Sequence, residues 1–348
     1  MIINSFKVLV YLRYDISYIY NDIYIKISGY LIERSDKMPG GENRHYFGWL
    51  PDYPDFRDYG LKKDALSTKS IKEGVRDTVA VMASKTGILL KPGEGKDEKL
   101  PAKADLRKWC SPIEDQGKLG SCTANAAIGL VEYFEKKANG NFINASRLFL
   151  YKTTRNLLQK TGDNGAYIRT TIMALVLFGA VPEKYWQYDV ESFDTEPDSF
   201  CYAFAQSYRT AQYFRLDTGK DISPADLLKQ IKLNIATKIP AIFGFSVYSS
   251  IGYAGENGGK IPFPSDKDKF EGGHAMVAVG YDDDMAIINP DSNLETTGAL
   301  LIRNSWGNQW GDEGYGWLPY EYVLKGLAVD WWTILENEWI DTGNFKLD

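Results

Sequence analysis

Residues 116–127 read QGKLGSCTANAA and place Cys122 at the head of an alanine-rich run. Apolar residues then recur at helical spacing as far as Phe134, and Asn139 and Gly140 are typical of a helix end, so the sequence predicts a helix that begins near the cysteine. The exposed N–H groups and the dipole at a helix start favour thiolate over thiol. Cys122 is therefore a candidate nucleophile, against the alternative that it is a buried structural cysteine.

The glutamine of the same stretch is a candidate hydrogen-bond donor for the reaction. Gly117 and Gly120 allow the turn between Gln116 and Cys122 to fold back. The side-chain amide of Gln116 and the backbone N–H of Cys122 then point into the same space, as the donors of an oxyanion hole do. The alternative is an ordinary loop glutamine.

A thiol nucleophile needs a base, and the chain offers only two histidines, His45 and His274. His274 begins an apolar strand within EGGHAMVAVGYDDD, and the two glycines before it permit the close approach of another backbone. Because imidazoles are so scarce in this chain, we expect His274 to be the base for Cys122.

The imidazole in turn needs a partner that fixes its orientation. In the stretch LIRNSWGNQWGDEGYGWLP, Asn304 can accept a hydrogen bond from His274, and Trp306 can lie over that bond and keep water away from it. Asn289 and Asp291 are alternative orienting residues, but only Asn304 has the neighbouring tryptophan. We therefore expect Asn304 to orient the histidine.

Together, these residues resemble the papain family of cysteine peptidases, whose functional residues occur in the order glutamine, cysteine, histidine, asparagine. The residues of this chain that follow the order are Gln116, Cys122, His274 and Asn304. The stretches LPAKADLRKWCSPIEDQG, GDNGAY and NSWGNQWGDEGYG are also similar to family motifs, so the resemblance covers roughly residues 100–325. The histidine and the asparagine both lie beyond the separation of about 130–150 residues from the cysteine that is typical of the family.

The resemblance implies an α+β fold of two lobes with the active-site cleft between them: a helical lobe over about residues 105–215 and an antiparallel β-barrel-like lobe over about 216–345. It implies a cysteine-type peptidase that works through a thioester acyl-enzyme, with no cofactor and no metal. It also implies which residues hold the substrate backbone and line the pocket for the residue two before the scissile bond, where we expect an apolar side chain. These residues are Gly165, Ala166, Tyr167, Ile168, Ala275 and Trp306.

Three positions depart from the family pattern. Thr123 stands where an aromatic residue is usual, Leu119 where many members have a disulfide cysteine, and Gly273 where Asp or Asn often precedes the histidine. The chain has only 3 cysteines, too few for a disulfide framework. The resemblance is therefore to a prokaryotic-type member without the usual disulfides.

The composition changes twice before the peptidase domain, which we place at residues 99–348. Residues 1–37 are rich in Ile, Tyr and Asn and differ from everything after them. They are either an extension upstream of a native start at Met38 or an added pair of strands.

Residues 38–98 occupy the place of an inhibitory prosegment. They contain the aromatic stretch FGWLPDYPDFRDY and end in the charged, glycine-bearing linker KPGEGKDEK. We expect Trp49, Tyr53 and Phe56 to anchor this segment on the enzyme body, and the stretch that runs to KPGEGKDEK to block the active site until a cut near Lys99. A permanent structural belt is the alternative.

The composition also limits the partners. A chain of 348 residues with 44% hydrophobic content can bury a core for two lobes. A net charge of −6, with acidic and basic residues intermixed, provides no basic stripe for nucleic acid. Charged residues interrupt the apolar runs near the N-terminus, so we expect neither a signal peptide nor a membrane span, and a cytoplasmic location with export left open.

The sequence therefore predicts an endopeptidase made as a zymogen, with a polypeptide substrate and an intramolecular inhibitory segment as its partners. An exopeptidase, an amidase or a transpeptidase on the same scaffold is an alternative. So is an inactive peptide-binding homologue, although the presence of all four catalytic residue types weighs against it.

Overall fold

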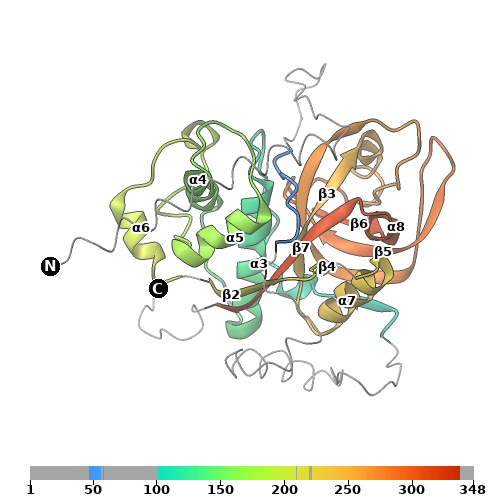
Figure 1. Cartoon of the computed structure of the whole chain (residues 1–348), viewed down its shortest axis with the longest axis horizontal. Coiled ribbons are helices and arrows are strands. Elements are labelled where there is room, and N and C mark those ends of the chain that lie inside the picture. The colour runs from blue at the N-terminus through green and yellow to red at the C-terminus, as the bar shows by residue number, and fades with distance from the viewer. Residues whose placement is uncertain (1–46, 56–57, 59–99, 209, 219–221, 338–348) are drawn as a thin grey trace. The chain divides into compact units, whose positions relative to one another are not determined.

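The computed structural model describes residues 47–55, 58, 100–208, 210–218 and 222–337. Within these ranges, four of the helices gather on one side and an antiparallel sheet on the other (Figure 1). This arrangement confirms the predicted α+β class. The predicted extension over residues 1–37, and most of the predicted prosegment over 38–98, lie outside the described residues.

The helical side is built around one buried helix. Its helices are α3 (Cys122–Asn139), α4 (Arg147–Leu157), α5 (Ile168–Leu177) and α6 (Ser199–Ala205). Helix α3 begins at Cys122 as predicted, and it ends at Gly140, which has a φ of 79° and donates its N–H to the carbonyl of Lys136 at 2.9 Å. Ser146 is the N-cap of helix α4, and its hydroxyl accepts a hydrogen bond from the N–H of Phe149 at 3.1 Å. Because most of α3 is buried, its first residue is held firmly in place.

The sheet has seven strands in the described residues: β1 (Lys103–Asp105), β2 (Thr210–Arg215), β3 (Ala241–Tyr248), β4 (Phe270–Ile288), β5 (Glu295–Arg303), β6 (Tyr315–Pro319) and β7 (Ala328–Asn337). The order is β2-β7-β3-β4-β5-β6, with β1 paired to β4, and all pairs are antiparallel. The sheet is open and not closed into a barrel. Helix α7 (Pro224–Ala236) packs on it, capped by Ser223.

Two features of the sheet differ from the sequence prediction. The sequence pattern of residues 314–323, GYGWLPYEYV, predicts a single strand, but β6 ends at Pro319 and the short helix α8 (Tyr320–Leu324) follows. Strand β7 was not predicted. It carries Trp331 and Trp332, which are both fully buried, so it lacks the alternation of apolar and polar residues that marks a half-exposed strand.

One hydrophobic core spans the helices and the sheet. Arg303, the last residue of β5, ties the two sides together through backbone carbonyls that precede α3. Its guanidinium donates to the oxygen of Ser111 at 2.5 Å and to that of Pro112 at 2.7 Å. Gly129 of α3 gives it room, because a Cβ there would lie 2.9 Å from Nε of Arg303. The end of β5, next to Asn304, is therefore fixed against the helical side.

An N-terminal segment, residues 47–55, lies between the helices and the sheet (blue trace in Figure 1). Trp49 forms a parallel bridge with Ala166, and its N–H donates to the carbonyl of Gly273 at 3.1 Å. Trp49 is only 6% exposed, whereas Tyr53 is 76% exposed, so the prediction that Tyr53 anchors the segment is wrong. The third predicted anchor, Phe56, lies outside the described residues.

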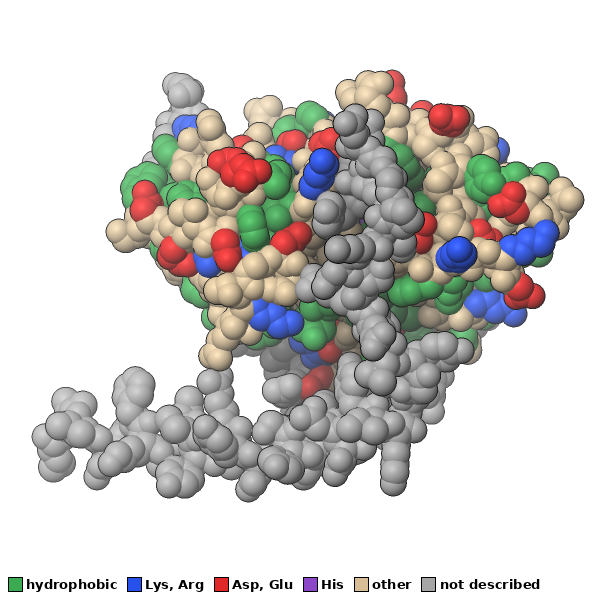
Figure 2. Space-filling view, turned by 90° about the horizontal axis from the view of Figure 1, so that it is seen from above, with side chains coloured by type: hydrophobic (Ala, Val, Ile, Leu, Met, Phe, Trp, Pro, Cys, Tyr) green, Lys and Arg blue, Asp and Glu red, His purple; other side chains and the backbone are tan. Residues whose placement is uncertain are grey.

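The surface of the described part carries charges of both signs. Figure 2 shows acidic and basic side chains interspersed on one face of the molecule. Among the helices that the structure describes, none combines the length and the hydropathy that a membrane crossing requires.

Candidate active site

Cys122 is the first residue of α3 and is fully buried. Burial raises the pKa of its thiol to about 11, while backbone amides of Ala275, Gly48 and Thr123 act in the opposite direction. The sequence led us to expect a lowered pKa at the helix start. That expectation is wrong for the state described, because the N-terminal segment covers the sulfur and its desolvation outweighs the nearby N–H groups.

A backbone hydrogen bond joins Ala275 of β4 to the sulfur of Cys122. His274 precedes Ala275 in the same strand and therefore lies near the start of α3. The imidazole of His274 stacks on Trp306, with ring centroids 4.8 Å apart and an angle of 22° between the planes. Its Nε2 lies 2.9 Å from Oδ1 of Asn304. Because an amide oxygen only accepts hydrogen bonds, Nε2 carries the hydrogen in this pair. The geometry is that of an imidazole oriented by a carboxamide.

The two alternative orienting residues bind elsewhere. Asn289 donates to the carbonyl of Phe263 at 3.0 Å. Asp291 accepts the hydroxyl of Tyr253 at 2.9 Å. Both lie in the turn between β4 and β5, at the far end of these strands from His274, which begins the buried stretch of β4.

Gln116 is fully buried beside the start of α3. Its Oε1 accepts the hydroxyl of Ser305 at 2.6 Å, and its Nε2 donates to the carbonyl of Leu119 at 2.9 Å. A carboxamide nitrogen carries two hydrogens, of which Leu119 takes one. The backbone of Gln116 also donates to the carbonyl of Ser305 at 2.9 Å, so the residue after Asn304 holds the glutamine in place.

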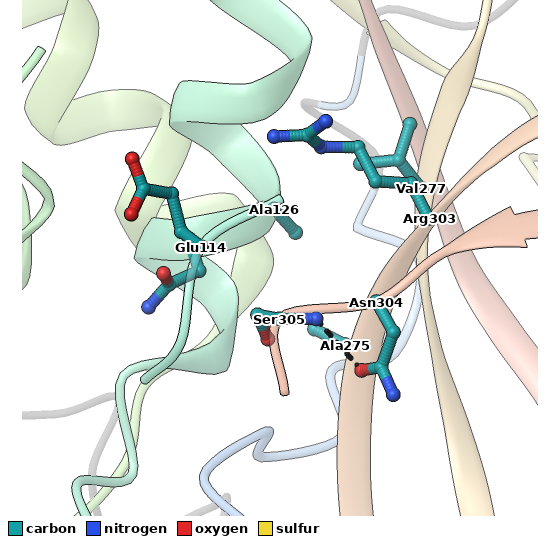
Figure 3. Close-up of a pocket in the computed structure, with 8 residues that line it drawn as sticks. Glu114, Ala126, Ala275, Val277, Arg303, Asn304 and Ser305 are labelled. Carbon is teal, nitrogen blue, oxygen red and sulfur yellow. Dashed lines mark hydrogen bonds between the residues drawn. The ribbon is translucent and has the colours of Figure 1, made fainter. Parts of the chain in front are cut away.

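A small cavity of about 10 Å³ lies between α3 and strands β4 and β5 (Figure 3). It is lined by Glu114, Asn125, Ala126, Ala275, Val277, Arg303, Asn304 and Ser305. Figure 3 shows Glu114 and Ala126 on the helical side and Asn304 and Ser305 on the strand side. A cavity of this size holds at most about one water molecule. It therefore does not serve as the pocket for a substrate side chain.

The predicted substrate-binding backbone is occupied by the N-terminal segment. The N–H of Ala166 donates to the carbonyl of Gly48 at 2.7 Å, and its carbonyl accepts the N–H of Leu50 at 3.0 Å. Gly165 has a φ of 68°, and a Cβ there would lie 2.2 Å from the oxygen of Gly48. The close approach of another backbone at this position thus requires a glycine.

The other predicted substrate-binding residues lie around the same place. Ile168 and Ala275 are buried and Tyr167 is half-buried, all three with the N-terminal segment in position. Phe47 contacts Trp306, with ring centroids 6.0 Å apart. Phe47 also packs at Gly272, where a Cβ would lie 3.1 Å from its side chain.

Of the residues that receive Trp49, only Gly273 was singled out from the sequence, as a place where another backbone can approach closely. The indole of Trp49 lies against Gly244 of β3 and Gly273 of β4, and its Nε1 donates to Oδ2 of Asp330 on β7 at 3.1 Å. We call this set, Gly244, Gly273 and Asp330, the Trp49 pocket. No motif predicts the pocket as a whole, because its members come from three separate strands and the strand that bears Asp330 was not predicted.

Two arginines, neither of which was singled out from the sequence, hold the segment beyond the Trp49 pocket. Arg169 of α5 pairs with Asp52, Nε to Oδ2 at 2.6 Å, and with Asp58. Arg215 at the end of β2 donates to the carbonyl of Asp52 at 2.9 Å and lies 3.7 Å from the carboxylate of Asp58.

Comparison with known proteins accords with this geometry. The model of the papain family cysteine proteases matches residues 100–324. The chain belongs to the papain family. Over 299 residues it is 32% identical to an uncharacterized peptidase C1-like protein of Acanthamoeba polyphaga mimivirus, covering 83% of this chain and 86% of that protein. The family is one of peptide-bond hydrolases, so this papain-family chain is a cysteine peptidase by descent.

Solved structures agree on the fold. Xylellain, a cysteine protease from Xylella fastidiosa, is 32% identical and aligns with a TM-score of 0.61 over 86% of this chain and 98% of that one. Procathepsin L 3 from the larval midgut of Tenebrio molitor, at 17% identity, shares the fold with a TM-score of 0.51 over 71% of this chain and 73% of its own. The sequence left open a pairing of Cys110 with Cys201, and in the structure all three cysteines of this papain-family chain are free.

Proposed function

We propose that this chain is an endopeptidase with a Cys122–His274–Asn304 triad, synthesised with its N-terminal segment as an inhibitor of its own active site. The observation that supports it is the meeting, at the start of α3, of a buried thiol, a histidine–asparagine pair and a covering strand of the same chain. Proform structures of related proteases, such as the ragweed pollen cysteine protease Amb a 11, supply a precedent for a covering segment.

In the proposed reaction, Nδ1 of His274 takes the proton of the Cys122 thiol, and the sulfur forms a bond to the carbonyl carbon of the substrate. The backbone N–H of Cys122 and the amide of Gln116 receive the oxyanion. As the C–N bond breaks, the imidazolium returns its proton to the leaving amine. Water then attacks the thioester, His274 takes a proton from that water, and the release of the acid regenerates the thiol.

The N-terminal segment directs a backbone N–H, and not a carbonyl carbon, at the sulfur of Cys122. The backbone of Gly48 lowers the pKa of the thiol, as an N–H donor does, while its carbonyl oxygen accepts from Ala166. Attack by the sulfur requires the opposite presentation, with a carbonyl carbon at the sulfur and its oxygen at the amide of Gln116. The segment therefore occupies the site without serving as a substrate.

The course of the segment favours an endopeptidase over an exopeptidase. On one side of Gly48, the ring of Phe47 lies 6.1 Å from that of His274. On the other side, Trp49 pairs with Ala166 and the chain continues towards Arg169. A polypeptide can thus extend past the sulfur in both directions, whereas an exopeptidase has to close one end.

A peptidyl epoxide, which alkylates an activated cysteine, tests the triad in the full chain carrying Trp49→Ala, a change that loosens the covering segment. We expect one adduct on Cys122 by peptide mapping, and a rate at least about 100-fold lower when His274→Ala is added. Cys110 and Cys201 are buried thiols and serve as internal controls. Equal labelling of Cys122 with and without His274 would contradict the proposed triad.

A further inference from the structure

The Trp49 pocket has the shape of a large, flat ring. A Cβ at Gly244 would lie 1.9 Å from Cε2 of Trp49, and a Cβ at Gly273 would lie 2.7 Å from Cε3. Any larger residue at either position would thus collide with the indole. The two glycines stand near each other on neighbouring strands, since Gly244 pairs with Ala275 and Ser246 with Gly273. The pocket therefore admits a bicyclic side chain that two ordinary strand residues would exclude.

The carboxylate of Asp330 closes the inner end of the Trp49 pocket and accepts hydrogen bonds there. Asp330 is fully buried, and its two carboxylate oxygens are divided between two indoles. Oδ1 accepts from Nε1 of Trp332 at 2.7 Å, and Oδ2 accepts from Nε1 of Trp49 at 3.1 Å. When Trp49 leaves, Oδ2 becomes a buried acceptor without its partner, and a substrate side chain with an N–H at the same depth restores the bond.

The backbone of Asp330 is built for this position. Its φ is 61°, a left-handed conformation that few residues other than glycine adopt, and its N–H donates to Oδ2 of Asp217 at 2.8 Å. Burial raises the pKa of Asp330 to about 6, which Arg215 and the two indoles oppose. The carboxyl is therefore ionised, and an acceptor on both oxygens, at neutral pH.

The charges around the pocket favour a neutral guest. Arg215 lies 3.3 Å from Oδ1 of Asp330 and 2.7 Å from the carboxylate of Asp217, and the guanidinium of Arg169 lies 5.5 Å from the ring of Trp332. With Asp52 and Asp58 withdrawn together with the segment, these two arginines and two aspartates balance each other. A cationic side chain at Oδ2 would lie beside the guanidinium of Arg215, which already pairs with this carboxylate, whereas a neutral N–H donor meets no such repulsion.

We infer that the Trp49 pocket is a substrate subsite selective for tryptophan at the position two before the scissile bond, with Asp330 as the residue that determines this specificity. The inference rests on the proposed function and narrows its substrate class. The pocket belongs to β3, β4 and β7, so it receives a side chain whichever way the backbone runs past Ala166. Trp49 shows which side chain fits, and the sequence-based expectation of a merely apolar guest is narrowed to one with an N–H.

The test compares peptides that differ only in the side chain two residues before the scissile bond. Three otherwise identical peptides carry tryptophan, 3-benzothienylalanine or leucine two residues before the scissile bond; benzothienylalanine replaces the indole N–H by sulfur at nearly the same shape. The enzyme is the full chain with Trp49→Ala, and the readout is the ratio of kcat/KM values. Covering by the loosened segment lowers all three rates alike, so the ratio reports the pocket alone.

We expect tryptophan to exceed benzothienylalanine by about 10-fold to 100-fold, the range for a buried hydrogen bond to a charged group. Adding Asp330→Asn should remove most of that preference, and adding Asp284→Asn, an exposed carboxylate on β4, should leave it intact. Equal rates for tryptophan and benzothienylalanine, or a preference for leucine, overturn the inference while leaving the peptidase in place. Cleavage of none of the three overturns the proposed function, and this inference with it.

Discussion

At the scale of single residues, the state of the Cys122 thiol separates the covered enzyme from the working one. Burial under Gly48 raises its pKa to about 11, so the covered thiol is protonated at neutral pH. Removal of the cover admits water to the sulfur and frees the site for the proton exchange with His274. Under the proposed function, the covered state is inactive for two reasons: the segment blocks the path of the substrate, and the thiol is protonated.

Alkylation against pH measures this difference. In the full chain we expect Cys122 to react with iodoacetamide only slowly below about pH 9, and Trp49→Ala to move the midpoint of the reaction to lower pH by at least one unit. Cys201, whose pKa burial raises to about 12, should react identically in both proteins. The same midpoint for Cys122 with and without Trp49 would show that the segment does not control the thiol.

In the proposed triad, Asn304 is a positioning residue that acts through His274. In the Trp49→Ala background, Asn304→Ala should lower kcat by about 10- to 100-fold with little change in KM, because the imidazole loses its fixed orientation but the substrate contacts remain. The control is Asp291→Ala, since Asp291 bonds Tyr253 and does not reach the histidine. A loss confined to KM, or the same loss for Asp291→Ala, contradicts the assignment.

At the scale of elements, helix α3 carries Cys122, the proposed nucleophile, at its start and two buried carboxyls further along. Burial raises the pKa of Glu132 to about 7 and that of Glu135 to about 8. The folded chain therefore holds protons that the unfolded chain releases above about pH 4.5. The stability that these groups contribute is fully present below that pH and is lost as the pH rises through 7 to 8.

Glu135→Gln tests this dependence, because its amide oxygen can still accept the N–H of Ile143 that the carboxyl accepts at 2.9 Å. We expect the free energies of unfolding of the two proteins to be similar near pH 5 and the variant to be more stable by about 1–3 kcal/mol at pH 8. Urea unfolding at both pH values measures it, with the exposed Glu295→Gln as control. A difference independent of pH would rule out the buried carboxyl as its source.

Among the elements, α5 also holds the N-terminal segment, through Arg169. Its guanidinium forms ion pairs with Asp52 and Asp58 and donates to the carbonyl of Tyr53 at 2.8 Å. Loss of these partly buried contacts costs about 1–2 kcal/mol of segment binding. Arg169→Gln in the full chain should therefore raise peptidase activity by about 5- to 30-fold.

The matched control for this prediction is Arg107→Gln. Arg107 also makes two ion pairs, with Asp105 and Asp312, but it touches neither the segment nor the site. Equal activity of the two variants would mean that the ion pairs of Arg169 do not hold the segment in place.

At the scale of the whole molecule, local patterns predicted the scaffold well and the long-range contacts poorly. The start and end of α3 and the strand of His274 follow from nearby residues, and the structure has them. The pairing of His274 with Asn304 was anticipated from the neighbouring Trp306, and the resemblance agrees with it. The Trp49 pocket was not, because it needs the spatial order of β4, β3 and β7, which no stretch of sequence encodes by itself.

The same reason explains the error about the thiol. A helix start predicts a lowered pKa for the Cys122 thiol. The local sequence does not indicate that Gly48, more than seventy positions earlier in the chain, lies over the sulfur. Tyr53 was predicted to be an anchor because it is aromatic, yet the segment turns it to solvent and uses charged neighbours instead. Aromatic composition alone does not decide which side chains are buried.

The most direct measurement of the central claim is the initial rate at which the full chain degrades an unfolded protein such as casein, compared among the wild type, Trp49→Ala and the double variant Trp49→Ala/Cys122→Ala. We predict that Trp49→Ala exceeds the wild type by at least about 10-fold, because the side chain that fills the pocket is gone, and that the double variant has no activity above background. Equal rates for the wild type and Trp49→Ala, or persistent activity without Cys122, would contradict the account.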